Sequence, residues 1–131
     1  MWRASTAAPI VLAFALSMTA RSVPLVEQRP VAPRYLRVSI ARWNINTYSP
    51  EAERIFHQIA TDGVGVFRAQ PGFIRYRLMR ADSATTVAVA EWESEELGTA
   101  GAERYRAWMR SVGIMDHITL ETRAGDIVAG S

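Results

Sequence analysis

The chain has 131 residues, of which 49% are hydrophobic and 21% charged, a composition typical of a single globular domain. Its 15 basic residues are all arginine and are scattered along the chain, so the net charge of +2 comes without the basic stripe that a nucleic-acid-binding surface needs. The absence of cysteine excludes disulfides and thiolate metal sites.

The first 20 residues differ in kind from the rest. Arg3 is followed by an uncharged stretch with an apolar run at residues 10–16, which is too short for a bilayer-spanning helix of about 20 residues. A basic start followed by a short apolar centre resembles a secretory signal peptide, which favours export. If translation instead starts at Met18, the protein is cytoplasmic. Neither reading includes a stable transmembrane span.

Residues 21–34 contain Pro24, Pro30 and Pro33 without periodicity, which indicates an extended linker. The folded domain is therefore expected over residues 35–128.

The domain is expected to open with a strand over residues 35–45. Leu36, Val38 and Ile40 alternate there with polar or small residues, the period of a strand whose apolar side is buried. A helix should follow from Ser49, which suits an N-cap and precedes a proline at the first helical position.

That first helix is expected to run to about Gln70. Gly63 and Gly65 lie inside it, and each costs roughly 1 kcal/mol relative to alanine. They predict a bend or a close packing contact.

Pro71 and Gly72 predict a tight turn that ends the helix and opens a second strand. In that strand, one face is apolar and the other holds arginines. The apolar face is Ile74, Tyr76 and Leu78, and the mixed face is Phe73, Arg75, Arg77 and Met79.

A third strand is expected over residues 85–92, apolar on both faces, and Ser94 should cap a second helix. The inward stripe of that helix is expected to be Leu97, Gly101, Tyr105, Trp108 and Val112. A fourth strand is expected from Ile118 to Glu121, with a continuation beyond the Gly125 region to Ile127 and Val128 as the alternative.

The predicted order is β-α-β-β-α-β, the ferredoxin-like split βαβ of the α+β class. In it, two helices cover one face of a four-stranded antiparallel sheet. Because the other face would still be apolar, pairing with a second copy of the chain is expected, and a homodimer is predicted.

Three segments resemble the antibiotic biosynthesis monooxygenase family of dimeric α/β barrels. They are the strand at residues 38–43, the turn at residues 70–73 and the strand at residues 87–94. The resemblance implies a cofactor-independent monooxygenase, with no metal, that uses dioxygen to oxidise a small aromatic or quinol-type substrate. Such a site needs an apolar pocket of roughly a few hundred cubic ångströms and a few hydrogen-bond donors.

The resemblance allows two other functions. One is a non-catalytic small-molecule-binding or stress-response module on the same fold. The other is a haem-degrading monooxygenase, for which Asn44 and Trp92 match the family positions. That branch also needs an axial histidine in the second helix, and residues 95–112 contain none.

The candidate catalytic residues are Trp92, Asn44 and Arg42. Trp92 would line the pocket and donate its indole N–H to the substrate; the alternative is that it is an aromatic residue of the core. Asn44 would hydrogen-bond the substrate, or serve a turn. Arg42 would stabilise an anion, or lie at the rim of the sheet.

The candidate substrate-binding residues are Trp43, Tyr76 and His57. Trp43 lies on the opposite strand face from Asn44, so only one of the two can face a given pocket. Tyr76 would reach the substrate, or be a satisfied core tyrosine. His57 would act as a base, or be a half-exposed helix residue.

Overall fold

The computed structural model describes residues 34–131, so the predictions for residues 1–20, and for the linker before Arg34, lie outside the described residues. The elements, in chain order, are β1 (Tyr35–Trp43), α2 (Pro50–Gln58), the π-helical turn η2 (Ile59–Gly63), α3 (Val64–Arg68), β2 (Phe73–Asp82), β3 (Thr85–Trp92), α4 (Glu95–Ser111), the 3-10 turn η3 (Ile114–Asp116) and β4 (Ile118–Asp126).

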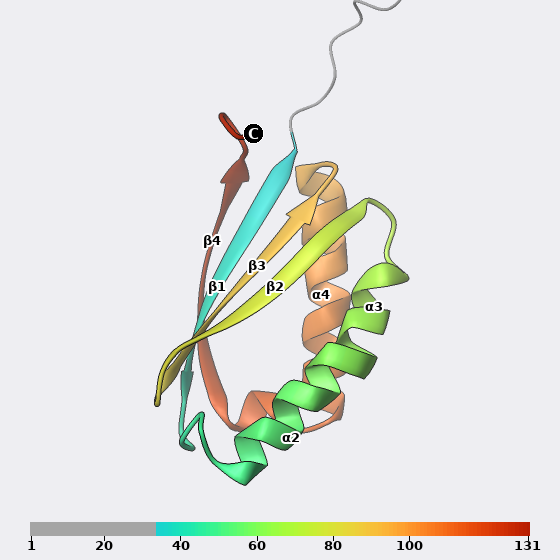
Figure 1. Ribbon diagram of the computed structural model, residues 1–131. Helices are drawn as coiled ribbons and strands as arrows, with labels where there is room; N and C mark the ends of the chain where they lie inside the picture. Colours follow the sequence, from blue (N-terminus) through green and yellow to red (C-terminus); the bar gives the residue numbers. More distant parts are fainter. Residues whose placement is uncertain (1–33) are drawn as a thin grey trace, which may run out of the picture. The chain divides into compact units, whose positions relative to one another are not determined.

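The four strands form one antiparallel sheet in the order β2-β3-β1-β4. Helices α2, α3 and α4 lie on one side of it and leave the other side uncovered (Figure 1). The predicted ferredoxin-like α+β fold is confirmed. Within residues 34–131, no helix is long and apolar enough to cross a membrane.

Helices α2 and α4 begin at the predicted caps. The Ser49 hydroxyl accepts the Ala52 N–H at 3.2 Å, and the Ser94 hydroxyl accepts the Leu97 N–H at 3.2 Å. Each serine thereby satisfies one of the N–H groups that a helix start leaves unpaired.

The first helical region is interrupted where its glycines lie. It runs as α2, the π-turn η2 and then α3, rather than as one α-helix. A Cβ on Gly63 would lie 2.9 Å from Cζ3 of Trp108 in α4, which confirms the predicted close packing. Gly65 has no such neighbour.

The Pro-Gly turn is also confirmed. Gly72 has a φ of 78°, a conformation that favours glycine, and a Cβ there would lie 2.9 Å from Cβ of Leu97. A register shift between Phe73 and Arg75 follows. It turns Phe73 toward Trp92, with ring centroids 5.5 Å apart, so the prediction that Phe73 shares the arginine face is wrong.

The buried face of β1 differs from the prediction. Tyr35, Ala41 and Trp43 are buried under the helices, whereas Ile40 is exposed on the uncovered face. The buried side holds the large rings of Tyr35 and Trp43 together with polar or small residues, so the alternation of aliphatic residues pointed to the side that the helices do not cover.

The inward side of α4 is partly as predicted. Gly101 and Tyr105 are buried, but Val112 is 37% exposed. Gly98 and Met109 complete the buried side. Strand β4 continues to Asp126 and passes through Gly125 without a break.

Candidate functional site

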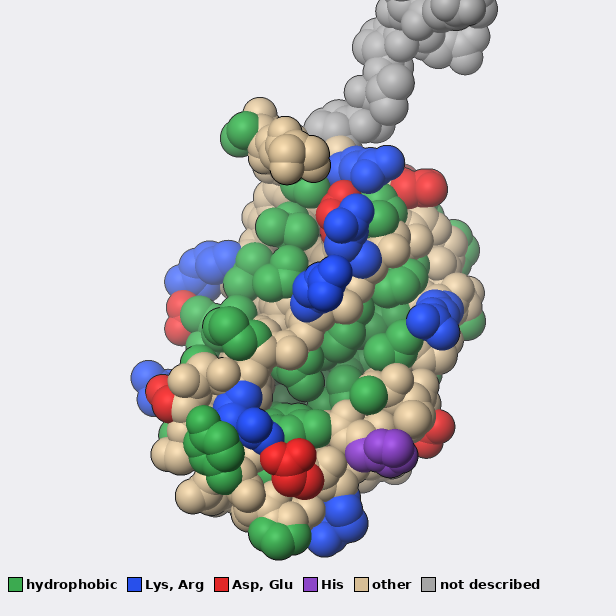
Figure 2. Space-filling model, viewed as in Figure 1, with side chains coloured by type: hydrophobic (Ala, Val, Ile, Leu, Met, Phe, Trp, Pro, Cys, Tyr) green, Lys and Arg blue, Asp and Glu red, His purple; other side chains and the backbone are tan. Residues whose placement is uncertain are grey.

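A cavity of about 80 Å³ lies between the sheet and the helices. It is several times the roughly 10–15 Å³ that one water needs, but smaller than the expected few hundred cubic ångströms. In Figure 2, hydrophobic side chains gather in a hollow of the visible surface, and charged side chains surround it. On the side of the sheet, the cavity is lined by small residues: Ser39, Ala41, Ala88 and Ala90.

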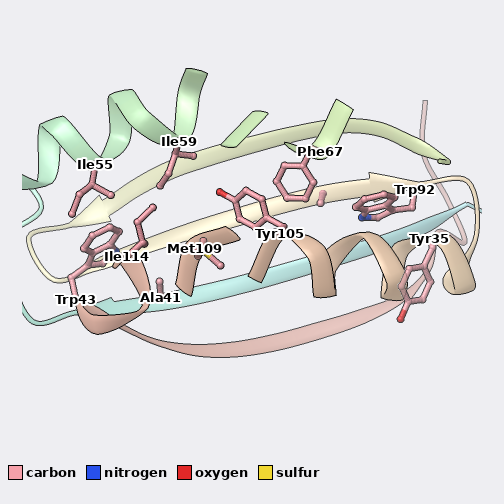
Figure 3. Packing of buried hydrophobic residues seen from close by; sticks show 11 residues of the cluster. Tyr35, Ala41, Trp43, Ile55, Ile59, Phe67, Trp92, Tyr105, Met109 and Ile114 are labelled. Carbon is pink, nitrogen blue, oxygen red and sulfur yellow. The ribbon is translucent and has the colours of Figure 1, made fainter. Parts of the chain in front are cut away.

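Aromatic rings cover these small residues from one side. Phe67 of α3 stacks on Tyr105 of α4 with centroids 4.0 Å apart, and Tyr76 of β2 lies 4.6 Å from Phe67. Trp92 meets Phe67 edge-on at 5.9 Å. Figure 3 shows Tyr105, Phe67 and Trp92 following one another along the sheet, with Phe67 in the middle. Space left by the small sheet residues is thus enclosed by rigid rings.

The two tryptophans of the cavity differ in hydrogen bonding. Trp43 donates its indole N–H to the hydroxyl of Thr86 at 2.9 Å. Trp92 is fully buried, and its N–H has no acceptor within the described residues. Buried donors are usually paired, so this unpaired N–H, on a residue that lines the cavity, is a candidate contact for a ligand.

Trp92 owes its position to α4. A Cβ on Gly98 would lie 3.1 Å from Cδ1 of Trp92, and a Cβ on Gly101 would collide with the six-membered ring. The indole therefore lies directly on the backbone of the helix, and its orientation is fixed by packing.

The tyrosines of the cavity are kept protonated. Burial raises the pKa of Tyr76, and the Tyr105 hydroxyl partly offsets this rise. Burial also raises the pKa of Tyr105, and the nearby Tyr76 adds to the rise. The Tyr105 hydroxyl has no partner with hydrogen-bond geometry in the described chain. At neutral pH both side chains are donors rather than bases.

The cavity is also lined by Arg37, Tyr105 and Arg106, which the sequence patterns did not mark as site residues. Tyr105 was expected to be buried, but as a core residue. Arg37 shares the strand face of Trp43, so choosing that face of β1 would have revealed it. Arg106 follows Tyr105 on α4, where the apolar stripe gives no signal for a charged residue.

Of the candidate residues, the structure brings Trp92, Trp43 and Tyr76 together at the cavity, but not Arg42 or Asn44. Arg42 is exposed on the uncovered face of the sheet. Asn44 donates to the carbonyl of Asp116 at 3.0 Å, and its Oδ1 lies 3.3 Å from Nδ1 of His117. Its contacts tie the end of β1 to the segment before β4.

His57 also lies away from the cavity. It is exposed on α2 and lines a surface groove that also contains His117 and Glu51. His117 Nε2 lies 3.6 Å from a carboxylate oxygen of Glu51. Within residues 34–131, no group of three or more metal-ligating side chains could hold a metal ion.

The sequence of residues 41–114, more than half of the chain, matches the family described as antibiotic biosynthesis monooxygenase. The chain belongs to the antibiotic biosynthesis monooxygenase family. The match extends from β1 to η3 and includes most of the residues that line the cavity.

Solved structures of similar fold include SnoaB from Streptomyces nogalater, described as a cofactor-independent oxygenase. It is 18% identical, with a TM-score of 0.60, over 76% of this chain and 97% of that chain. A putative antibiotic biosynthesis monooxygenase from Nitrosomonas europaea is 13% identical, with a TM-score of 0.57, over 76% of this chain and 95% of that one. HapK from Hahella chejuensis is 11% identical, with a TM-score of 0.60, over 74% of this chain and 95% of that one. At these identities the likeness shows the fold alone. No curated protein matches the chain.

Proposed function

We propose that this antibiotic biosynthesis monooxygenase family protein is a cofactor-independent monooxygenase that oxidises a small aromatic or quinol-type substrate. The observation that carries the proposal is the unpaired, buried N–H of Trp92, a residue that lines an apolar cavity. SnoaB, which has the same fold, supports the cofactor-independent chemistry by analogy.

The chemistry needs a substrate that can reduce dioxygen once it has lost a proton. For a ring CH₂ group activated as a phenolate or enolate, one oxygen atom becomes the carbonyl oxygen and the other leaves as water with both hydrogens. All four electrons come from the substrate. The N–H of Trp92 would stabilise the anionic oxygen, and the enclosing rings would exclude water.

The size of the cavity restricts the substrate. About 80 Å³ suits one ring, or two rings with small shifts of side chains, better than the larger polycyclic molecules. Substrates of one or two rings are therefore the first to test.

A homodimer would cover the apolar face of the sheet that the helices leave exposed. The uncovered face of the sheet, opposite the helices, carries the apolar residues Leu36, Val38, Ile40, Met79, Val87 and Val89. Ile40 and Met79 are 38% and 55% exposed. Such a patch across the centre of a sheet favours burial against a second copy.

The test is oxygen uptake by purified protein with a panel of one-ring hydroquinones and two-ring naphthohydroquinones, with three-ring anthrones as the larger comparison. A chelator is present and no flavin is added. We expect consumption of one dioxygen per oxygen atom inserted into the product, above the rate of the uncatalysed reaction. Failure to consume dioxygen with any member of the panel would rule the proposal out for these substrates.

A second candidate function is non-catalytic binding of a small aromatic molecule. It is favoured because no histidine, aspartate or glutamate of the described chain lines the cavity, and both tyrosines hold their protons. Tight binding of the same panel without oxygen uptake would identify this function.

A further inference from the structure

Two arginines line the otherwise apolar cavity. Arg37 comes from β1 and Arg106 from α4, and both are half-buried. Neither forms an ion pair or a side-chain hydrogen bond with a described residue, and no acidic side chain of the described chain lines the cavity. The cavity therefore carries positive charge that no described acidic side chain neutralises.

Some arginines of the described domain have acidic partners, and those without one, apart from Arg37 and Arg106, are exposed to water. Arg34 and Arg75 both reach Glu91, at 3.4 and 3.3 Å, and Arg80 pairs with Glu53. A guanidinium half-removed from water without a counter-ion loses hydration that nothing replaces. Two such groups on one small cavity favour an anionic ligand.

The position of Arg37 in the sheet gives the dimensions of that ligand. Ala90 pairs with Tyr76 on one side and with Arg37 on the other. Tyr76 and Arg37 are thus two strand spacings apart, roughly 10 Å between backbones, with only the methyl group of Ala90 between them. A ring packed on Tyr76 over Ala90 would direct a substituent toward Arg37.

We propose that the cavity is specific for aromatic carboxylates, with the carboxylate bound by Arg37 and Arg106 and the ring held among Tyr76, Tyr105 and Trp92. Arginine suits this task because its planar guanidinium pairs with a carboxylate through two parallel hydrogen bonds. The carboxylate is a recognition group, separate from the ring oxygen that would meet the N–H of Trp92. The inference rests on the same cavity as the proposed function and defines its substrate class.

The test uses calorimetric binding of probes that cannot be oxidised. Benzoate and 2-naphthoate are compared with benzamide and 2-naphthamide, which have nearly the same shape and no charge. We expect at least one carboxylate to bind the wild-type protein ten times or more tighter than its amide, with a preference that weakens as salt is added.

Arg37→Gln and Arg106→Gln should each reduce carboxylate affinity about tenfold and leave amide affinity within about twofold. Arg104→Gln is the matched control, because Arg104 is exposed on the same helix and does not line the cavity. It should preserve the preference. Thermal unfolding of each variant verifies that it is folded.

Equal binding of acid and amide by the wild type, an unchanged preference in both cavity variants, or no binding of any probe would overturn the inference. Because these probes consume no dioxygen, the outcome is independent of turnover. If the protein prefers carboxylates but consumes no dioxygen with any quinol, the carboxylate inference is supported and the proposed monooxygenase activity is contradicted. If it consumes dioxygen with neutral quinols but shows no carboxylate preference, the monooxygenase activity is supported and the carboxylate inference is contradicted.

Discussion

The indole of Trp92 lies so close to the backbone of Gly101 that a side chain at residue 101 would occupy the space of the ring. Strand β3 and helix α4 meet through this contact, and it positions the unpaired N–H of the candidate site.

Gly101→Ala should therefore destabilise the protein by about 1–3 kcal/mol, because the new methyl group must displace a fully buried ring. Gly65→Ala is the matched control: Gly65 is exposed in α3 with no neighbour within 4 Å, so alanine should stabilise by about 0.5–1 kcal/mol. Urea unfolding measures both. A neutral Gly101→Ala would mean that the ring can move away without cost.

Trp92→Phe removes the unpaired donor and breaks no hydrogen bond in the described chain. It should lower oxygen uptake about a hundredfold if the N–H stabilises an anion. Trp43→Phe also shrinks a cavity ring, but it leaves Thr86 without its indole donor. That variant should lose about 1 kcal/mol of stability and retain more of the uptake. Equal loss of uptake in both variants would indicate an effect of ring volume alone.

Tyr105→Phe tests the effect of burial on titration. Because the folded-state pKa of Tyr105 is raised, its contribution to stability is fully present below the unfolded-state value near pH 10 and is lost as pH rises above it. Tyr105→Phe should make the urea midpoint fall less steeply between pH 9 and pH 11. Tyr48→Phe, at a tyrosine that is 61% exposed, is the control. Parallel curves for wild type and Tyr105→Phe would contradict the prediction.

Val89→Arg tests the uncovered face. Val89 is flanked in the sheet by Val38 and Arg77, so a new arginine would place like charges side by side in the middle of the apolar patch. We expect light scattering to give a dimer for the wild type and a monomer for Val89→Arg. Ala107→Arg, on the exposed side of α4, should remain dimeric. A wild-type monomer at micromolar concentration would exclude the dimer.

Asn44→Ala separates the two roles considered for this residue. Its amide hydrogen-bonds the carbonyl of Asp116 outside the cavity, so we expect a loss of about 1 kcal/mol and unchanged binding of aromatic probes. A large loss of binding without a loss of stability would return Asn44 to the candidate site.

The order of elements and the fold were predictable because their signals are local. Ser49 and Ser94 cap helices through their own side chains, and Gly72 forms its turn with its own backbone. The family was likewise recognisable from segments at residues 38–43, 70–73 and 87–94.

The sequence alone determined the succession of strands and helices, since caps, turns and apolar periods act between neighbouring residues. Only the tertiary structure decided which side of β1 faces the helices, because each side carries large apolar residues and helix packing selects the one with Trp43. That choice placed Arg37 at the cavity and Arg42 and Asn44 away from it. The candidate site depends on contacts between residues distant in the chain, such as Trp92 with Gly101, which no local pattern encodes.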